Sequence, residues 1–288
     1  MKAYTPVIII GAGRSGTNML RDIITSIDGF KTWDCDEINP IWRYGNRDFP
    51  TDELPVEKLS PRIKKYIRGR FNSLHKKTGA NFIVEKTCAN SLRLNYVHAI
   101  FPNAKYIIIN RDGRDVVPSA MKRWVSSFEL KYTLKKLRYV PITDLSFYIW
   151  RFGFNRLKKI FSNTENLAFW GPLYSGIEED VKTKSLLETC ANQWRICAEK
   201  TIEHREYIYS EKIFDIKYEE FVSNPVEEMK RLSDFFEVFI SEEKIIDLVK
   251  KVTDKSVGSH KRKFSAEEIQ KITKITKPTL KKLNYSID

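Results

Sequence analysis

The sequence predicts a single α/β domain with a central parallel sheet flanked by helices, and three observations carry this prediction. An apolar strand, a polar turn and a helical pattern follow one another three times, beginning near residues 7, 81 and 105. The run VIII at residues 7–10 does not alternate with polar residues, which is typical of a strand buried on both faces of a parallel sheet. The 288 residues contain no internal repeat and no low-complexity linker. We therefore expect ligands at the carboxyl ends of the strands.

The first 80 residues are expected to supply two strands and two helices. After the strand at 7–10, apolar residues recur at helical spacing over 17–27. Residues 30–33 are predicted to form a second strand, and residues 34–60, rich in Asp, Asn and Pro, are predicted to be irregular. Residues 61–78 begin with proline and carry many Lys and Arg, which predicts a basic helix.

The remaining chain is expected to complete the sheet. Strands at 81–84 and 105–109 precede helices near 90–100 and 114–125. Residues 126–182 are aromatic and basic and are interrupted by Pro and Gly, so we expect them to form the wall of an acceptor site. A helix is predicted over 183–206, a strand over 213–217, and another helix where Asn224 is the cap and Pro225 the first helical residue. The tail alternates loop and helix.

Charge and composition restrict the class of partner. The net charge is +13, from 50 Lys and Arg against 37 Asp and Glu, which favours an anionic partner: a nucleotide, a nucleic acid, an acidic polysaccharide or a membrane surface. No apolar run approaches the ~20 residues of a membrane helix, and the first run is too short for a signal peptide. The four cysteines form no CxxC pair and are interpreted as reduced thiols, so we expect a cytoplasmic protein.

The turn GAGRSGTN at residues 11–18 matches two known phosphate-binding motifs incompletely. Its glycines fit the dinucleotide fingerprint G-x-G-x-x-G, and acidic residues follow about 20 residues later. It also resembles the P-loop of nucleoside triphosphatases, but Thr17 stands at the lysine position and Asn18 at the magnesium hydroxyl position. A magnesium–triphosphate site is therefore disfavoured.

A third interpretation keeps the phosphate site and omits the metal. Backbone N–H groups at the start of the helix would bind a phosphate, and Arg14, Ser15 and Thr17 would add hydrogen bonds to it. A second element, RDGRDVVPS, follows the strand at 105–109. It places Arg111 at the strand end and Ser119 two turns into the next helix, where the two side chains could bind another phosphate.

These two elements resemble those of the sulfotransferases that use 3′-phosphoadenosine 5′-phosphosulfate (PAPS). The family's 5′-phosphosulfate loop looks like G-x-x-R-S-G-T, and its 3′-phosphate element has an Arg and a Ser eight residues apart after a strand. The stretch VEKTCAN is similar to the family's KT element, DIKYEEFVSNP to its tyrosine-acid segment, and GSHKRKFSAEEIQKI to its basic C-terminal loop. The similarity is weak over 126–200, where such enzymes differ by acceptor.

The resemblance implies PAPS as co-substrate, PAP as product and a P-loop-like fold. It implies nucleotide contacts from the glycine turn, the second element, the tyrosine segment and the basic loop, namely Gly13, Arg14, Ser15, Gly16, Thr17, Asn18, Arg111, Ser119, Tyr218, Lys261 and Arg262. Arg14 and Lys86 are the expected cations at the transferred group, and Glu37 is the expected general base. Cys88 stands where one branch of the family has a histidine.

Structural roles are alternatives for several of these residues. Arg111 could pair with Asp112 or Asp115, Tyr218 could pack in the core, and Lys86 could be a solvated surface lysine.

The sequence thus favours a sulfotransferase acting on a hydroxyl group of a carbohydrate or similar small acceptor. An NAD(P)-dependent oxidoreductase and a non-catalytic basic nucleotide-binding protein are the alternatives. No nucleic-acid-binding motif occurs, and no two of the four histidines have metal-ligand spacing, so neither a nucleic-acid partner nor a metal site is expected.

Overall fold

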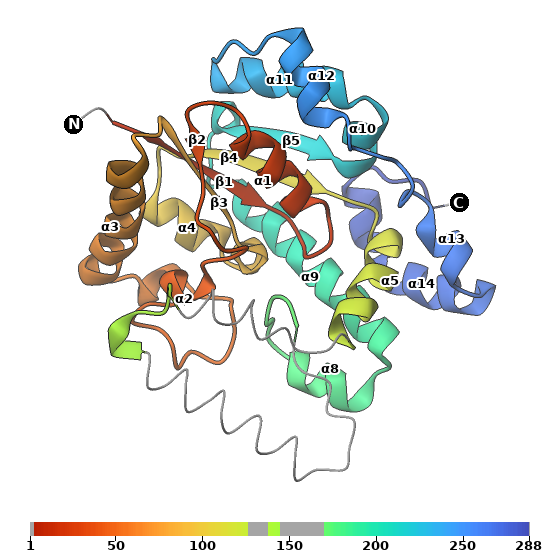
Figure 1. Ribbon diagram of the computed structural model, residues 1–288. Coiled ribbons are helices and arrows are strands. Elements are labelled where there is room, and N and C mark those ends of the chain that lie inside the picture. Colours follow the sequence, from red (N-terminus) through yellow and green to blue (C-terminus); the bar gives the residue numbers. More distant parts are fainter. Residues whose placement is uncertain (1–2, 126–137, 145–169, 288) are drawn as a thin grey trace.

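Five parallel strands form the central sheet in the computed structural model, which describes residues 3–125, 138–144 and 170–287 (Figure 1). The strand order is β2-β3-β1-β4-β5. The strands are β1 (Thr5–Ile10), β2 (Phe30–Lys31), β3 (Phe82–Lys86), β4 (Lys105–Asn110) and β5 (Ile213–Lys217). The predicted fold class is confirmed.

The centre of the sheet is β1, as its uninterrupted apolar run predicted. It pairs with β3 on one side, where Ile9 is opposite Lys86, and with β4 on the other, where Ile10 is opposite Ile108. Its four apolar residues are fully buried, with Ile8 and Ile10 in one core cluster and Val7 and Ile9 in another. Burial on both faces is what requires an apolar residue at every position.

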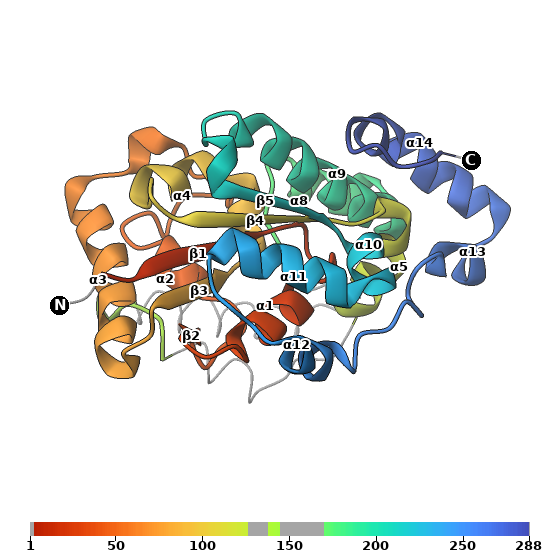
Figure 2. The ribbon, with the colours of Figure 1, turned by 90° about the horizontal axis from the view of Figure 1, so that it is seen from above.

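Helices cover both faces of the sheet (Figure 2). One face carries α2, α3 and α4, the other carries α1, α10, α11 and α12, and a third cluster of apolar residues joins α5, α8, α9 and α14. The α-helices are α1 (Thr17–Thr25), α2 (Asn39–Trp42), α3 (Pro61–Thr78), α4 (Leu94–Ile100), α5 (Gly113–Trp124), α8 (Ile177–Thr183), α9 (Leu186–Arg205), α10 (Tyr218–Ser223), α11 (Pro225–Phe236), α12 (Glu242–Val249), α13 (Ser259–Lys263) and α14 (Ala266–Lys282). Short 3₁₀ turns lie at Val56–Lys58, Cys88–Leu92, Ile142–Asp144 and Ser210–Lys212.

The structure differs from the sequence prediction at four places. β2 ends at Lys31, two residues before its predicted end, since only Phe30 and Lys31 pair with β3. β3 runs to Lys86, two residues beyond its predicted end, because it continues pairing with β1 up to Ile9. The helix expected near 90–100 is a 3₁₀ turn followed by α4. Residues 34–60 are not wholly irregular, since α2 and a 3₁₀ turn lie within them. Most of the predicted acceptor wall, 126–137 and 145–169, lies outside the described residues.

The strand order contradicts the dinucleotide interpretation. In the dinucleotide-binding fold β2 lies beside β1, and the acid that binds the ribose follows β2. Here β3 lies between β1 and β2, so the acidic residues after β2 do not end the strand next to the glycine turn. The alternative of an NAD(P)-dependent oxidoreductase is therefore wrong.

Two further sequence expectations concern cysteines and membrane spans. All four cysteines are buried, and none of them forms a disulfide bond among the described residues. Within the described part of the chain, no helix is both long enough and apolar enough to cross a membrane.

The start of α5 packs so closely on α9 that only glycine fits at residue 113. A Cβ atom there would lie 2.4 Å from Cε3 of Trp194, whereas a Cβ at Gly69, within α3, would meet nothing within 4 Å. We expect Gly113→Ala to lower the free energy of unfolding by about 1–3 kcal/mol through overpacking. Gly69→Ala, the matched control, should raise it by about 0.5–1 kcal/mol through helix propensity. Urea unfolding followed by circular dichroism measures both, and equal effects would contradict the packing argument.

Candidate active site

The glycine turn between β1 and α1 has a strained and crowded backbone. Arg14 has φ 72° and Gly16 has φ 91°, so two residues adopt the left-handed conformation, which is rare for an arginine. A Cβ at Gly16 would lie 2.5 Å from Cδ2 of Tyr218, so the turn also fits only glycine there. Strained backbone conformations of this kind cluster at ligand sites.

The N-terminus of α1 has no side-chain cap, and six other described α-helices also lack a side-chain cap. Ser or Asp side chains cap α3, α5, α9, α12 and α14, whereas α1 begins at Gly16 with no side-chain cap and no acidic residue in its first turn. The hydroxyl oxygen of Ser15 is buried and has no hydrogen-bond partner among the described residues. Uncapped N–H groups at the positive end of a helix form a site for an anion.

Three guanidinium groups lie near this turn. Burial lowers the pKa of Arg14, and the positive charges of Arg123 and Arg111 lower it further, although Cys88 and Asp36 act in the opposite direction. Like charges this close repel each other, and an anion between them would remove that cost. Arg123, on α5 one turn beyond Ser119, was missed in the sequence, although its i,i+4 spacing from Ser119 places it on the same helix face.

The second predicted element lies directly against the first. Nε of Arg14 donates a hydrogen bond to Oγ of Ser119 (2.9 Å), and Nη1 of Arg111 donates to the carbonyl of Arg14 (3.1 Å). The side chain of Arg111 also donates to the carbonyl of Ser256 (2.9 Å), while its Nε is buried without a partner among the described residues. The structure therefore brings Arg14, Arg111 and Ser119 together at one point, although they come from different elements.

Arg111 is not paired with the acids beside it in the sequence. Asp112 forms an ion pair with Arg114 (2.7 Å), and Asp115 binds the C-terminal loop. The guanidinium of Arg111 instead stacks on the ring of Tyr218, with its carbon 4.2 Å from the ring centroid. Tyr218 is itself part of the buried core, so it packs structurally and also orients Arg111.

The basic C-terminal loop is held to α5 by Asp115. This carboxylate accepts hydrogen bonds from the backbone N–H of Gly258 (2.7 Å) and of His260 (2.9 Å), and it contacts Nδ1 of His260 (2.7 Å). Burial alone would raise the pKa of Asp115, but these contacts lower it below its ordinary value. Lys261 and Arg262 are exposed, and Arg262 donates to the carbonyls of Lys255 (2.6 Å) and Val257 (3.2 Å). The loop thus lies next to Arg111, with its two predicted contact residues at the surface.

The expected catalytic residues Lys86 and Glu37 form an ion pair at the end of β3. Nζ of Lys86 lies 3.1 Å from Oε1 of Glu37, which also accepts from the backbone N–H of Cys88 (3.2 Å). Burial would lower the pKa of Lys86, but the carboxylate of Glu37 raises it above its ordinary value, so the lysine stays charged. Lys86 is 3% exposed, so it is not a solvated surface lysine.

The ion pair is joined to the glycine turn. Oγ1 of Thr17 lies 3.7 Å from Sγ of Cys88, and the side-chain amide of Asn18 donates to Asp36 (3.2 Å). Burial raises the pKa of the Cys88 thiol to about 12, so this thiol is neutral and cannot act as a base. The cluster of Glu37 and Lys86 therefore borders the glycine turn, through the contacts of Thr17 with Cys88 and of Asn18 with Asp36.

A buried polar network fixes the segment that carries Glu37. Arg93 is fully buried; it donates to Asn90 (2.9 Å), to Asn39 and to Asp52 (3.4 Å). Asp52 also accepts from Arg43 (3.0 Å), and Asn90 donates to the buried carboxylate of Glu85, the residue before Lys86. The network joins residues 39–52 to the end of β3, and the sequence analysis missed it because nothing marks these charges as buried.

Two further observations concern the acceptor and metal binding. A Cβ at Gly13 would lie 3.0 Å from the ring of Trp170, so this tryptophan borders the turn. Among residues 3–125, 138–144 and 170–287, no group of three His, Cys, Asp or Glu side chains could hold a metal ion.

Comparison with known proteins places these features in a family. A model described as the sulfotransferase family matches residues 6–163 and 155–242. A search of curated proteins finds no match.

Solved structures share the fold at low sequence identity. The sulfotransferase domain from the curacin biosynthetic pathway is 14% identical, with 100% of both chains covered and a TM-score of 0.59. Sulfotransferase STF9 from Mycobacterium avium is 12% identical over 99% of this chain and 78% of that chain, with a TM-score of 0.57. Mouse sulfotransferase SULT7A1, crystallised with PAP, is 13% identical over 97% of this chain and 86% of its own, with a TM-score of 0.53.

The buried network supplies a stability prediction. Asp52 is 2% exposed and accepts hydrogen bonds from two buried arginines, so Asp52→Ala would leave two positive charges without a carboxylate. We expect a loss of about 3–5 kcal/mol in the free energy of unfolding. Asp48→Ala removes an exposed pair with Arg47 (3.5 Å) and should cost below about 1 kcal/mol. Denaturant unfolding of the two variants compares them, and similar losses would contradict the role of the network.

Proposed function

The chain belongs to the sulfotransferase family, matched over residues 6–163 and 155–242, and on that premise we propose that it transfers the sulfuryl group of PAPS to a hydroxyl group of an acceptor. The transfer proceeds by in-line displacement, and its leaving product is PAP. Family membership makes the chain an enzyme, so the alternative of a non-catalytic binding protein is wrong.

The observation that carries the proposal is the contact between the two phosphate elements. Arg14 reaches Ser119, and Arg111 reaches the carbonyl of Arg14, so two anion sites from different parts of the sequence adjoin each other. A nucleotide with phosphate groups at two positions of one ribose fits such a pair. The Ser15 hydroxyl and the Arg111 Nε, which have no hydrogen-bond partner among the described residues, lie one in each element and are suited to donate hydrogen bonds to such phosphates.

Residues of the turn would bind the 5′-phosphosulfate. Backbone N–H groups of the turn and of the start of α1, other than that of Ser15, which donates to the carbonyl of Ala12 (3.2 Å), would bind the anion, and the hydroxyls of Ser15 and Thr17 would donate to it. Thr17 and Asn18 replace the lysine and hydroxyl of a magnesium-binding P-loop, which supports charge neutralisation by arginine and lysine.

Arg111 and Ser119 would bind the 3′-phosphate. The hydroxyl of Ser119 accepts a hydrogen bond from Arg14, so its own proton is available to donate to a phosphate oxygen. Lys261 and Arg262 lie on the short helix α13, whose start Asp115 holds to α5, and they would add positive charge near the same phosphate.

Catalysis would depend on two cations and one base. Arg14 neutralises charge on the leaving oxygen, and Lys86 stabilises the transferred group. Glu37 accepts the proton of the attacking hydroxyl, and its contact with Lys86 (3.1 Å) holds the carboxylate beside the cation that stabilises the transferred group.

We extend the proposal to the acceptor, the domain organisation and the cellular compartment. The acceptor is a hydroxyl of a carbohydrate or similar small molecule, which the net charge of +13 supports if the acceptor is acidic. Residues 1–288 form one sulfotransferase domain in which 126–182 contribute the acceptor wall. The four buried cysteines, none of them in a disulfide bond among the described residues, support a reducing compartment, and we assign the enzyme to the cytoplasm.

Calorimetric titration with adenosine 3′,5′-bisphosphate in EDTA tests the nucleotide site. We expect binding of the bisphosphate in preference to NAD and ATP. Arg111→Ala should bind it about ten- to a hundredfold more weakly, since charge-assisted hydrogen bonds contribute about 1.5–3 kcal/mol. Arg62→Ala, an exposed arginine on α3, is the matched control and should bind within about twofold of wild type. Binding of NAD without the bisphosphate would contradict the proposal.

Kinetics of Glu37→Gln test the general base. We expect kcat for transfer from PAPS to fall by about 10²–10⁴, while the affinity for the bisphosphate is retained, because the amide cannot take the proton. Glu57→Gln, at an exposed position in the 3₁₀ turn Val56–Lys58, is the control and should match wild type. Steady-state assays over a panel of carbohydrate acceptors measure the change, and an unchanged kcat in Glu37→Gln would exclude this residue as the base.

A further inference from the structure

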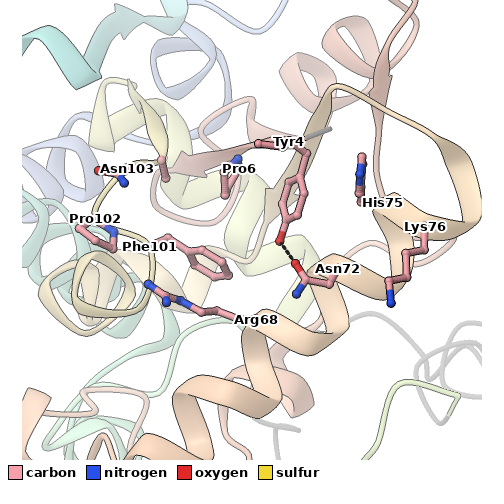
Figure 3. Close-up of a pocket in the computed structure, with 11 residues that line it drawn as sticks. Tyr4, Pro6, Arg68, Asn72, His75, Lys76, Phe101, Pro102 and Asn103 are labelled. Carbon is pink, nitrogen blue, oxygen red and sulfur yellow. Dashed lines mark hydrogen bonds between the residues drawn. The ribbon is translucent and has the colours of Figure 1, made fainter. Parts of the chain in front are cut away.

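A second pocket lies at the edge of the sheet opposite the glycine turn. Its volume is about 480 Å³, within the range of small-molecule sites, and it is lined by the start of β1, by α3 and by the turn between α4 and β4 (Figure 3). Parallel strands point their carboxyl ends at the glycine turn, so their amino ends face this pocket. It is therefore remote from Arg14, Lys86 and Glu37.

One wall of the pocket is apolar and aromatic. Pro6, Phe101 and Pro102 line it, and Phe101 is 5% exposed. The ring of Tyr4 stacks on His75 at a centroid distance of 5.0 Å, and its hydroxyl donates to Asn72 (2.8 Å), which fixes the ring at the pocket. A flat apolar group of a ligand would pack against such a wall.

The opposite wall is cationic. Arg68, Asn72 and Lys76 are spaced i, i+4 and i+8 on α3, so they lie along one face of that helix, and Figure 3 shows them along the pocket. Nε of Arg68 donates to the carbonyl of Ile100 (2.8 Å), which fixes the guanidinium beside Phe101. Within the described chain, the two terminal nitrogens of Arg68 have no hydrogen-bond partner, so they can donate to a ligand.

The positive charge of α3 favours a ligand with a negative charge. Its 18 residues contain no Asp or Glu, and seven Lys and Arg: Arg62, Lys64, Lys65, Arg68, Arg70, Lys76 and Lys77. The pocket lining also contains no acidic residue. The basic helix that the sequence analysis identified has no part in sulfuryl transfer, so this charge is otherwise unexplained.

We propose that this pocket binds a small anionic molecule with an aromatic or similarly flat apolar body, at a site separate from the transfer site. The anionic group lies among Arg68, Asn72 and Lys76, and the apolar body packs against Phe101 and Pro6. Both parts are required, because the pocket combines one apolar wall with one cationic wall. The proposal does not depend on the group that the enzyme transfers.

Calorimetry with phenyl phosphate as probe tests this site, with saturating adenosine 3′,5′-bisphosphate present to fill the transfer site. Inorganic phosphate and benzyl alcohol supply the charge and the ring separately. We expect phenyl phosphate to bind at least tenfold more tightly than either. Arg68→Met and Lys76→Met should each weaken it at least fivefold. Lys65→Met removes the same charge from an exposed position on α3 outside the pocket lining and should change it less than twofold.

Several results would overturn the proposal. Absence of phenyl phosphate binding to wild type is one. Equal weakening by Lys65→Met and Lys76→Met would indicate a diffuse basic surface, such as one that binds nucleic acid. Loss of binding in Arg111→Ala but not in Arg68→Met would place the probe at the transfer site. Because Arg68 also bonds to Ile100, thermal unfolding of each variant confirms folding, and Lys76→Met tests the site if Arg68→Met does not fold.

Discussion

The candidate site depends on positive charge at the ends of β1 and β4. This charge is maintained because neither of the acidic residues near Arg111 in the sequence forms an ion pair with it. Asp112 and Asp115 adjoin Arg111 in the sequence, yet the first binds Arg114 and the second binds the loop at Gly258–His260. Arg111 is held instead by backbone carbonyls and by the face of Tyr218. A cation fixed in this way retains its attraction for an outside anion, which an ion pair would have cancelled.

At the end of β3, by contrast, the cation is paired with a carboxylate. Lys86 is paired with Glu37 (3.1 Å), and this pair is buried at its lysine end, beside the proposed phosphate site. The polar network beneath it, through Glu85, Asn90 and Arg93, fixes the backbone of the segment that carries Glu37. Precise placement of the proposed base and the proposed cation relative to the turn is what the proposed in-line displacement would require. Stability and proposed catalysis thus use the same buried contacts.

Local patterns predicted most of the fold and one half of the site. The apolar run of β1 and the spacing of the glycines reflect local constraints, so the buried strand and the turn after it could be predicted from the sequence. The partnership of Arg14 with Ser119 spans 105 residues, and only the family resemblance brought the two together. The roles of Asp52 and Arg93 could not be predicted, because the sequence does not distinguish a buried charged residue from an exposed one. Arg123 could have been found from its helical spacing to Ser119.

A crystal structure with adenosine 3′,5′-bisphosphate, grown in EDTA, tests most directly whether the glycine turn and the Arg111 element form one nucleotide site. We expect one phosphate on backbone N–H groups of the glycine turn other than that of Ser15, and the other phosphate between Arg111 and Ser119, with the Ser119 hydroxyl donating to it. A bisphosphate bound elsewhere, or with one of these two elements not contacting a phosphate, would contradict the account.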